Sequence, residues 1–273
     1  ERQLKRVTSQ LGLNDIHCLS TFRIRRLQAY IDADILDLHC MHGGFFSYLA
    51  LPWLTENKPA VVSLHDMWPF TGHCGYSFDC ERWKIGCGQC PYLGTPPFIL
   101  RDGTRAEWKL KNWVYSRSNL TIVAQSQWLA DLAKQSLLNR FPIHHIPNGV
   151  DTDVYRPHDS LQCRSLLGIP PRSKVLLFVA ASLDGRVKGG DLLIQALQAL
   201  PQSLKEETVL LLMGDRGESL ANRVGIRTLN LGYVASDHFK AIAYSAADLF
   251  LHPTRAENMP LVLLESMACG TPM

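Results

Sequence analysis

The segment Asp248–Met273 reads DLFLHPTRAENMPLVLLESMACGTPM, and the fold assignment depends on its pattern. The apolar run Asp248–His252 predicts a short buried strand, and a polar loop with Glu257 follows it. Pro260 marks the start of a helix that carries Glu265. A strand, a loop and a helix in this order form the unit from which parallel α/β sheets are built.

The same alternation extends along the chain. Runs rich in Val, Ile and Leu predict further strands at Ile35–His39, Ala60–Leu64, Leu120–Ala124, Ile143–Ile146, Lys174–Val179, Thr208–Met213 and Arg227–Leu231. Helical patterns lie between them, at Phe46–Thr55, Arg105–Ser116, Gln127–Leu138, Asp191–Leu200 and Asp237–Ser245. The pattern favours parallel sheets with helices on both faces. Turn signals at Asn148-Gly149 and Pro157 predict two domains, residues 1–149 and 150–273.

Composition excludes several classes of protein. The chain has 273 residues, 46% of them apolar, and 28 basic against 25 acidic residues give a net charge of +3. This is a globular composition, and the charge is too small to indicate nucleic-acid binding. No uncharged apolar run reaches the ~18 residues of a membrane span, and no signal peptide is visible at the start. We therefore expect a cytoplasmic location.

The first residues favour an amphipathic helix. Leu4, Val7 and Leu11 share one face, opposite Arg2, Lys5 and Arg6. The plain interpretation is a solvated helix whose apolar face packs on a sheet. The alternative is a basic face that meets anionic lipid at the inner side of the membrane.

The two acidic residues near the end have a chemical use. Glu257 lies at the carboxyl end of a predicted strand, where open α/β sheets bind ligands. Glu265 follows eight residues later, about 80° past two full helical turns. A carboxylate accepts two charge-assisted hydrogen bonds from sugar or ribose hydroxyls, and the free N–H groups of a helix start can receive a phosphate.

The segment HPTRAENMPLVLLESMACGTPM resembles the E-x7-E motif of family-4 glycosyltransferases, approximately PSxxEgfPxxxlEAmAxGxPV. These enzymes have the GT-B fold, in which two Rossmann-like domains face a cleft. The resemblance implies that Glu257 lies at the donor sugar and acts in catalysis, and that Glu265 holds the ribose. It also places a short segment near the sugar and phosphates of the donor, namely Asn258, Met259, Pro260 and Leu261.

Other segments extend the resemblance. FVAASLDGRVKGGDLLIQAL matches the first strand, loop and helix of the donor domain, where Lys188-Gly189 would face the diphosphate. The family's usual Arg is replaced by Ser182, and Arg186 is the nearby candidate to substitute for it. LGYVASDHFKAIAYSAADLFLHP implies that Tyr233 or Val234 flanks the base, with Tyr244 and Asp248 in structural roles.

The N-terminal half carries matching residues too. In VVSLHDMWPFTGHC, His65 follows a strand, and the resemblance implies that it reaches the donor sugar and acts in catalysis. A neutral imidazole both donates and accepts, which suits a sugar hydroxyl. His39 and His42 end the preceding strand, and Ser126, Gln127 and Asn148 are further candidates to face the cleft.

A Cys-rich insert of residues 71–97 is similar to one found in transferases of the colanic-acid type. Its spacing is Cys74-x5-Cys80-x6-Cys87-x2-Cys90. Four thiols at this spacing predict a structural zinc site, because Cys-x2-Cys has the bite of a zinc knuckle. Reduced thiols and disulfides remain alternatives.

Together these features predict a hexosyltransferase with two Rossmann-like domains. It would move a hexosyl group from a nucleotide-diphosphate sugar to a glycan or lipid-linked acceptor, with retention and with no catalytic metal. Because complete family members are longer, both domains are expected to be incomplete: the first strand and Gly-rich loop and the C-terminal part are missing. The fragment alone is expected to be inactive. The alternatives are an epimerase-like GT-B enzyme and a non-catalytic, zinc-bearing interaction module.

Overall fold

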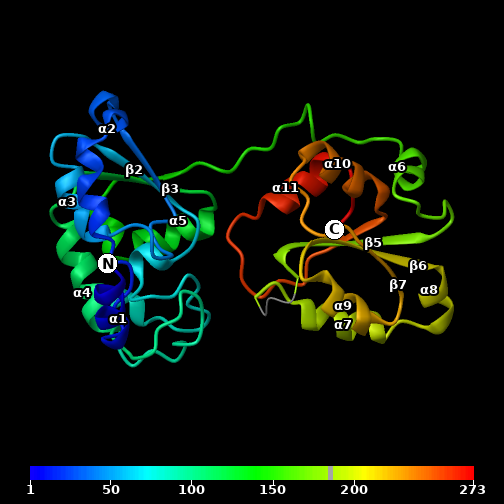
Figure 1. Ribbon diagram of the computed structural model, residues 1–273, viewed down its shortest axis with the longest axis horizontal. Coiled ribbons are helices and arrows are strands. Elements are labelled where there is room, and N and C mark those ends of the chain that lie inside the picture. The colour runs from blue at the N-terminus through cyan, green and yellow to red at the C-terminus, as the bar shows by residue number, and fades with distance from the viewer. Residues whose placement is uncertain (184–186) are drawn as a thin grey trace. The chain divides into compact units, whose positions relative to one another are not determined.

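The computed structural model describes residues 1–183 and 187–273 and divides into two compact units, Glu1–Pro147 and Asn148–Met273 (Figure 1). Within these residues each unit has its own four-stranded sheet, and all the strand pairs are parallel. The predicted α/β class is confirmed. The division falls between residues 147 and 148, close to the expected one, and the acceptor and donor roles of the two halves stay predictions.

In the first unit the strands pair in the order β1 (Leu36–His39), β2 (Ala60–Leu64), β3 (Leu120–Ala124) and β4 (Ile143–His145). Its helices are α1 (Arg2–Gln10), α2 (Gln28–Asp32), α3 (Leu51–Leu54), α4 (Thr104–Tyr115) and α5 (Gln127–Lys134), with 3₁₀ turns at Leu19–Arg26, Tyr48–Ala50, Trp68–Phe70, Arg82–Lys84 and Leu137–Arg140. The two central strands are buried at every second residue, and one hydrophobic core joins them to the helices. This places the loops after β1, β2 and β3 at one edge of the sheet.

Two predicted helices of this unit are wrong in extent. The expected helix Phe46–Thr55 is a 3₁₀ turn followed by the single turn of α3, with Pro52 near its start. The expected helix Gln127–Leu138 is interrupted because the Ser136 side chain accepts the N–H of Leu138. A side chain that accepts a backbone N–H competes with the helical hydrogen bond.

The second unit has the strand order β7 (Arg227–Asn230), β6 (Thr208–Asp215), β5 (Lys174–Ser182) and β8 (Leu249–Leu251). Its helices are α6 (Ser160–Leu166), α7 (Gly190–Gln198), α8 (Gln202–Glu207), α9 (Gly217–Val224), α10 (Asp237–Ala246) and α11 (Leu261–Ala268). The sequence patterns had not indicated α6, α8 and α9.

Helices cover both faces of this sheet (Figure 1). Successive residues of β6 alternate between two cores: Val209 and Leu211 pack with α10, and Leu210 and Leu212 pack with α7 and α9. A strand buried on both faces is apolar at every position, which is why Thr208–Met213 reads as a continuous run.

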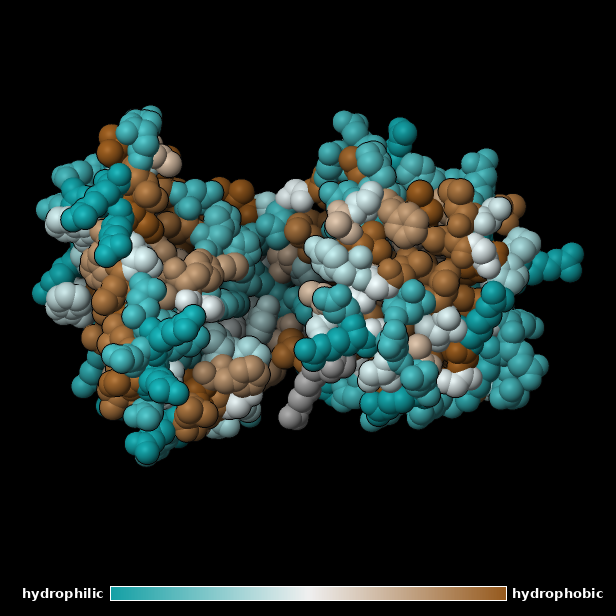
Figure 2. Space-filling model, in the orientation of Figure 1, coloured by the Kyte–Doolittle hydropathy of each residue, from teal (hydrophilic) through white to brown (hydrophobic). Residues whose placement is uncertain are grey.

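Helix α1 forms as its spacing predicts, but the predicted packing of its apolar face on a sheet is wrong. Val7 and Leu11 are 54% and 59% exposed, whereas Thr8 is buried. After α1 the chain turns at Gly12, packed against the backbone of Arg101. Figure 2 shows hydrophobic residues, in brown, among hydrophilic ones on the face it displays. Within the described residues, no helix combines the length and apolar character that a membrane span requires.

A glycine substitution tests the packing of β6 on β5. A Cβ at Gly214 would lie 1.7 Å from the carbonyl oxygen of Ala180, and φ there is +143°. We expect Gly214→Ala to lower the free energy of unfolding of the second unit by about 3 kcal/mol, because the strands must shift. Urea denaturation measures the change. Gly149→Ala, with nothing within 4 Å of the added Cβ, should stay within about 0.5 kcal/mol of the parent. Equal stability of the two variants would contradict this packing.

Candidate functional site

The strand order of the second unit indicates a candidate ligand position. From β5 the chain adds β6 and β7 on one side, and β8 then pairs with the other side of β5. β5 and β8 are therefore adjacent strands. The loops that follow them leave the carboxyl edge of the sheet in different directions. Open α/β sheets bind ligands at such a switch point. The loop after β5 leads to Lys188, and the loop after β8 carries Glu257.

Lys188 and Glu257, two predicted site residues, meet at this edge. The Lys188 ammonium donates to Glu257 Oε1. The Glu257 side chain is 15% exposed and that of Lys188 is 36% exposed. An ammonium next to a carboxylate offers a cation for phosphate oxygens and an acceptor for hydroxyls within one small area. The structure thus joins two residues that the sequence had indicated separately.

Backbone contacts hold the two loops together. A Cβ at Gly189 would lie 1.8 Å from the carbonyl oxygen of Pro253, and φ there is +75°, so only glycine fits. Val187 O accepts the Arg255 N–H at 2.8 Å and the Thr254 hydroxyl at 3.1 Å. The start of α7, directly after Gly189, is therefore fixed beside the loop that carries Glu257.

An ion pair that the sequence analysis missed strengthens this connection. Both terminal nitrogens of Arg255 donate to the Asp191 carboxylate at 2.7 Å. The hydrogen bonds from Arg255 lower the pKa of Asp191 to about 2. No short sequence pattern links these residues, because they lie 64 positions apart.

His252 was also missed. It follows β8, its side chain is 14% exposed, and its Nε2 lies 4.0 Å from Glu257 Oε1. This buried Nε2 has no hydrogen-bond partner among the described residues. Burial lowers the pKa of His252, so the ring is neutral at pH 7. Its position at the end of a predicted strand was the sequence feature that could have marked it as a candidate site residue.

Glu265 lies on α11 and is held by α10. The hydroxyl of Tyr244, which is fully buried, donates to Glu265 Oε2 at 2.8 Å. One carboxylate oxygen is thereby fixed, which orients the other. Tyr244 has the structural role expected of it, and that role is to position Glu265.

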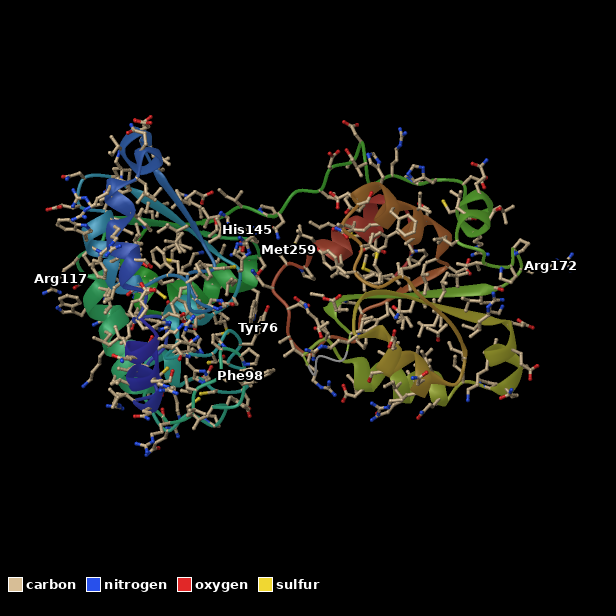
Figure 3. All side chains as sticks on the ribbon, viewed as in Figure 1. Tyr76, Phe98, Arg117, His145, Arg172 and Met259 are labelled. Atoms are coloured by element: carbon tan, nitrogen blue, oxygen red, sulfur yellow. The ribbon has the colours of Figure 1, made fainter. Side chains whose placement is uncertain are left out.

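The other described donor residues predicted from the sequence lie after β7 and β8, at the same edge of the sheet. Met259, labelled in Figure 3, precedes α11, and its carbonyl oxygen accepts the side-chain amide of Asn148 at 3.0 Å. Asn258 and Pro260 flank it, and Leu261 starts α11. Tyr233 and Val234 follow β7; Tyr233 is 71% exposed and Val234 packs on the core. Arg186 lies outside the described residues.

In the first unit, two pairs of side chains that include histidine, His39 with His65 and His42 with Asp66, lie at the carboxyl edge of the sheet. His39 Nδ1 lies 2.8 Å from His65 Nε2, and His39 Nε2 lies 3.1 Å from Asp37 Oδ2. Because a carboxylate only accepts, the proton in the contact with Asp37 lies on His39 Nε2. Burial, with His39 next to it, lowers the pKa of His65. His42 Nε2 lies 2.9 Å from Asp66 Oδ2, whose other oxygen accepts the Trp68 N–H.

Two family models match the chain. One described as Glycosyltransferase Family 4 matches residues 6–154, more than half of the chain, and one described as Glycosyl transferases group 1 matches residues 173–273. The colanic acid biosynthesis glycosyl transferase WcaC of Escherichia coli (strain K12) is 27% identical over 252 residues, which are 88% of this chain and 58% of that protein. The chain spans about half the length of the curated relatives it matches.

Solved structures share the fold. Sucrose-phosphate synthase from Thermosynechococcus elongatus has a TM-score of 0.66 and 18% identity, covering 94% of this chain and 59% of that one. Anabaena HepE in complex with UDP-glucose has a TM-score of 0.59 and 20% identity, covering 91% and 61%. These likenesses confirm the predicted fold class, an α/β fold of the GT-B type.

The charges around His252 give a test of the site geometry. Glu257 raises the pKa of His252 and Lys188 lowers it, against the dominant lowering by burial. We expect Glu257→Gln to lower this pKa further and Lys188→Met to raise it. NMR titration of the ring protons measures both shifts. Lys174→Met, at the opposite end of β5, is the control and should leave the titration unchanged. Shifts of the same sign in the two site variants would contradict the arrangement.

Proposed function

The chain belongs to glycosyltransferase family 4, and we propose on that premise that it transfers a hexosyl group from a nucleotide-diphosphate sugar to a glycan or lipid-linked acceptor in surface polysaccharide synthesis. The observation that carries the proposal is the meeting of Lys188 and Glu257 at the switch point between β5 and β8. The protein is then a hexosyltransferase.

Each residue of the site has a role in this proposal. Lys188 leaves Glu257 for the diphosphate and, with the first N–H groups of α7 after Gly189, stabilises the charge that develops on the leaving group. Glu257 then accepts hydroxyls of the donor sugar. Glu265, oriented by Tyr244, accepts the ribose hydroxyls through its second oxygen.

The neighbouring loops complete the proposed donor site. The segment Asn258–Leu261 borders the sugar and phosphates, and Tyr233 and Val234 border the base. His65 as a second catalytic group stays a prediction. Transfer with retention is part of the proposal, and NMR of the product's anomeric proton reads it directly. Release of an isomerised free sugar without an acceptor would instead favour the epimerase-like alternative.

Nucleotide binding tests the donor site. UDP is the first probe because the similar HepE structure holds UDP-glucose, with GDP and ADP tested beside it. At about 100 times its dissociation constant, the nucleotide that binds should stabilise the protein by about 2.7 kcal/mol. Glu265→Ala should weaken its binding about 10- to 100-fold, because charge-assisted hydrogen bonds to the ribose are lost. Thermal shift and calorimetry measure both effects.

The controls lie at the opposite edge of the same sheet. Glu206→Ala removes a carboxylate, as Glu265→Ala does, but from α8, the helix that leads into β6. Lys174→Met removes an ammonium, as Lys188→Met does, but from the start of β5. Both controls should bind the nucleotide as the parent does. No stabilisation by any of the three nucleotides, or equal loss in site and control variants, would contradict the donor site.

We also propose a peripheral contact of α1 with anionic membrane surfaces. Arg2, Lys5 and Arg6 are exposed on the helix that exposes Val7 and Leu11. A basic helix with exposed apolar side chains binds the interface of anionic bilayers.

Vesicle sedimentation tests this contact. We expect binding to phosphatidylglycerol-containing vesicles that Val7→Asp/Leu11→Asp abolishes, because two apolar side chains no longer enter the interface. Leu166→Asp, at a position 73% exposed on α6, should retain it. Equal binding of both variants would contradict a role for α1.

A further inference from the structure

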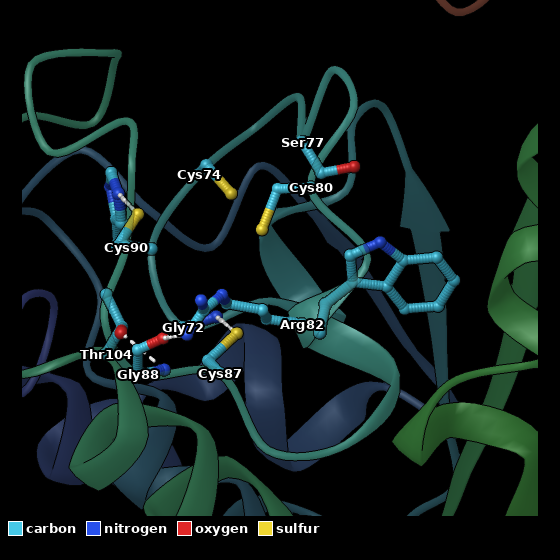
Figure 4. A pocket seen from close by; sticks show the side chains of 11 residues that line it. Gly72, Cys74, Ser77, Cys80, Arg82, Cys87, Gly88, Cys90 and Thr104 are labelled. Carbon is cyan, nitrogen blue, oxygen red and sulfur yellow. Dashed lines mark hydrogen bonds between the residues drawn. The ribbon is translucent and has the colours of Figure 1, made fainter.

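The Cys-rich insert forms one small pocket that the proposed transfer reaction does not use. All four of its cysteines line the pocket, together with His73 and Arg82 (Figure 4). The insert has little regular structure apart from the 3₁₀ turn Arg82–Lys84. None of the four cysteines forms a disulfide. Four thiols from a span of seventeen residues thus converge without any covalent link between them.

Backbone and side-chain groups orient the sulfurs. Cys87 Sγ accepts the Gly72 N–H at 3.2 Å, and Cys90 Sγ accepts the Tyr92 N–H at 3.4 Å. Asp102 accepts the Cys90 N–H at 2.8 Å and so fixes the backbone at that cysteine. Donors aimed at sulfur stabilise a thiolate more than a thiol, because the thiolate is the stronger acceptor.

His73 orients Cys90 from the other side. Its Nδ1 lies 2.9 Å from the carbonyl oxygen of Pro97, which can only accept, so Nδ1 carries the proton. The other ring nitrogen, Nε2, lies 3.3 Å from Cys90 Sγ. The ring is thus held by Pro97 through one nitrogen and contacts a cysteine of the pocket with the other.

Two cations lie near the sulfurs. Arg82 lines the pocket, and the buried Lys111 ammonium interacts electrostatically with Cys87. Both can compensate the negative charge of thiolates bound to a metal.

We propose that Cys74, Cys80, Cys87 and Cys90 bind one zinc ion as a tetrahedral, structural site. Each thiol gives its proton to solvent and forms one Zn–S bond, so four protons leave as one Zn²⁺ enters. The site then carries two negative charges, which Arg82 and Lys111 offset. Four thiolates leave no open position, so the ion has no part in the transfer step.

Binding requires a small closure of the insert. Among the residues that the structure describes, no three His, Cys, Asp or Glu side chains already stand at coordinating positions. The sulfurs therefore move inward around the ion, which a loop with little regular structure permits. The closure acts on the functional segment after β2: Met67 N–H donates to Gly75 O at 2.7 Å, and the Thr71 hydroxyl donates to Cys74 O at 2.7 Å. Zinc thus fixes the loop that follows His65 and Asp66.

Metal analysis tests the proposal directly. The protein purified under reducing conditions and exposed to Zn²⁺, then freed of excess metal, should contain about one zinc per chain. Replacement by Co²⁺ should give an intense thiolate-to-cobalt charge-transfer band. Cys87→Ser/Cys90→Ser should lose both signals, and Cys40→Ser, an exposed thiol outside the pocket, should keep both. His73→Gln should keep the metal with about 10- to 100-fold weaker affinity.

Several results would overturn the four-thiolate site. Unmodified protein that holds no zinc under these conditions would do so without any variant having to fold. Disulfides among the four cysteines, found by mass spectrometry of the reduced-purified protein, would do the same. Loss of metal in His73→Gln but not in Cys90→Ser would contradict the proposed ligand set and indicate His73 as a ligand in place of Cys90.

Discussion

The pairing of β8 with β5 is the interaction on which the candidate donor site depends. It places the loops after two neighbouring parallel strands side by side, although Lys188 and Glu257 lie 69 residues apart. Three further contacts keep the loops together: the close approach of Gly189 to Pro253, the bonds to Val187 O, and the Arg255–Asp191 pair. Helices on both faces of the sheet bury β5 and β8, whose carboxyl ends lead to the candidate site residues.

The start of β8 is fixed by a buried cation. Arg164 on α6 donates to Asp248 Oδ1 and to the carbonyl oxygens of Ala246, Pro171 and Ser173, while Asp248 Oδ2 accepts the Val175 N–H of β5. The buried guanidinium of Arg164 is thus compensated by several hydrogen bonds, as a buried charge requires, whereas the Asp248 side chain is 53% exposed. Asp248 has the structural role expected from the sequence, and the reason is that it closes the amino end of the pairing between β5 and β8.

A second buried cation organises the Cys-rich loop of the first unit. Lys111 on α4 is fully buried, donates to the carbonyl oxygens of Trp68 and Thr71, and lies 3.5 Å from the centroid of the Trp68 ring. Burial lowers the pKa of Lys111 to about 8, and Glu107, one turn earlier on α4, opposes this shift. The loop between β2 and α4 is therefore anchored at its start by a lysine and, in our proposal, at its centre by zinc. Asp66, hydrogen-bonded to His42 and to the Trp68 N–H, stands at the junction of that loop with the sheet.

The sequence by itself determined the α/β class, the eight strands close to their observed bounds, and the region where the chain divides, because these depend on local periodicity and on Gly and Pro at turns. It also indicated Lys188, Gly189, Glu257 and Glu265 through motif resemblance. Only the tertiary structure decided which strands are neighbours, and hence that Lys188 meets Glu257 and that His252 is buried near Glu257. The same holds for the contact of Arg255 with Asp191 and for the hydrogen bond by which Tyr244 orients Glu265. The tertiary structure also decided that Thr8 is buried while Val7 is exposed. Such contacts join residues tens of positions apart, and periodicity within one element carries no information about them.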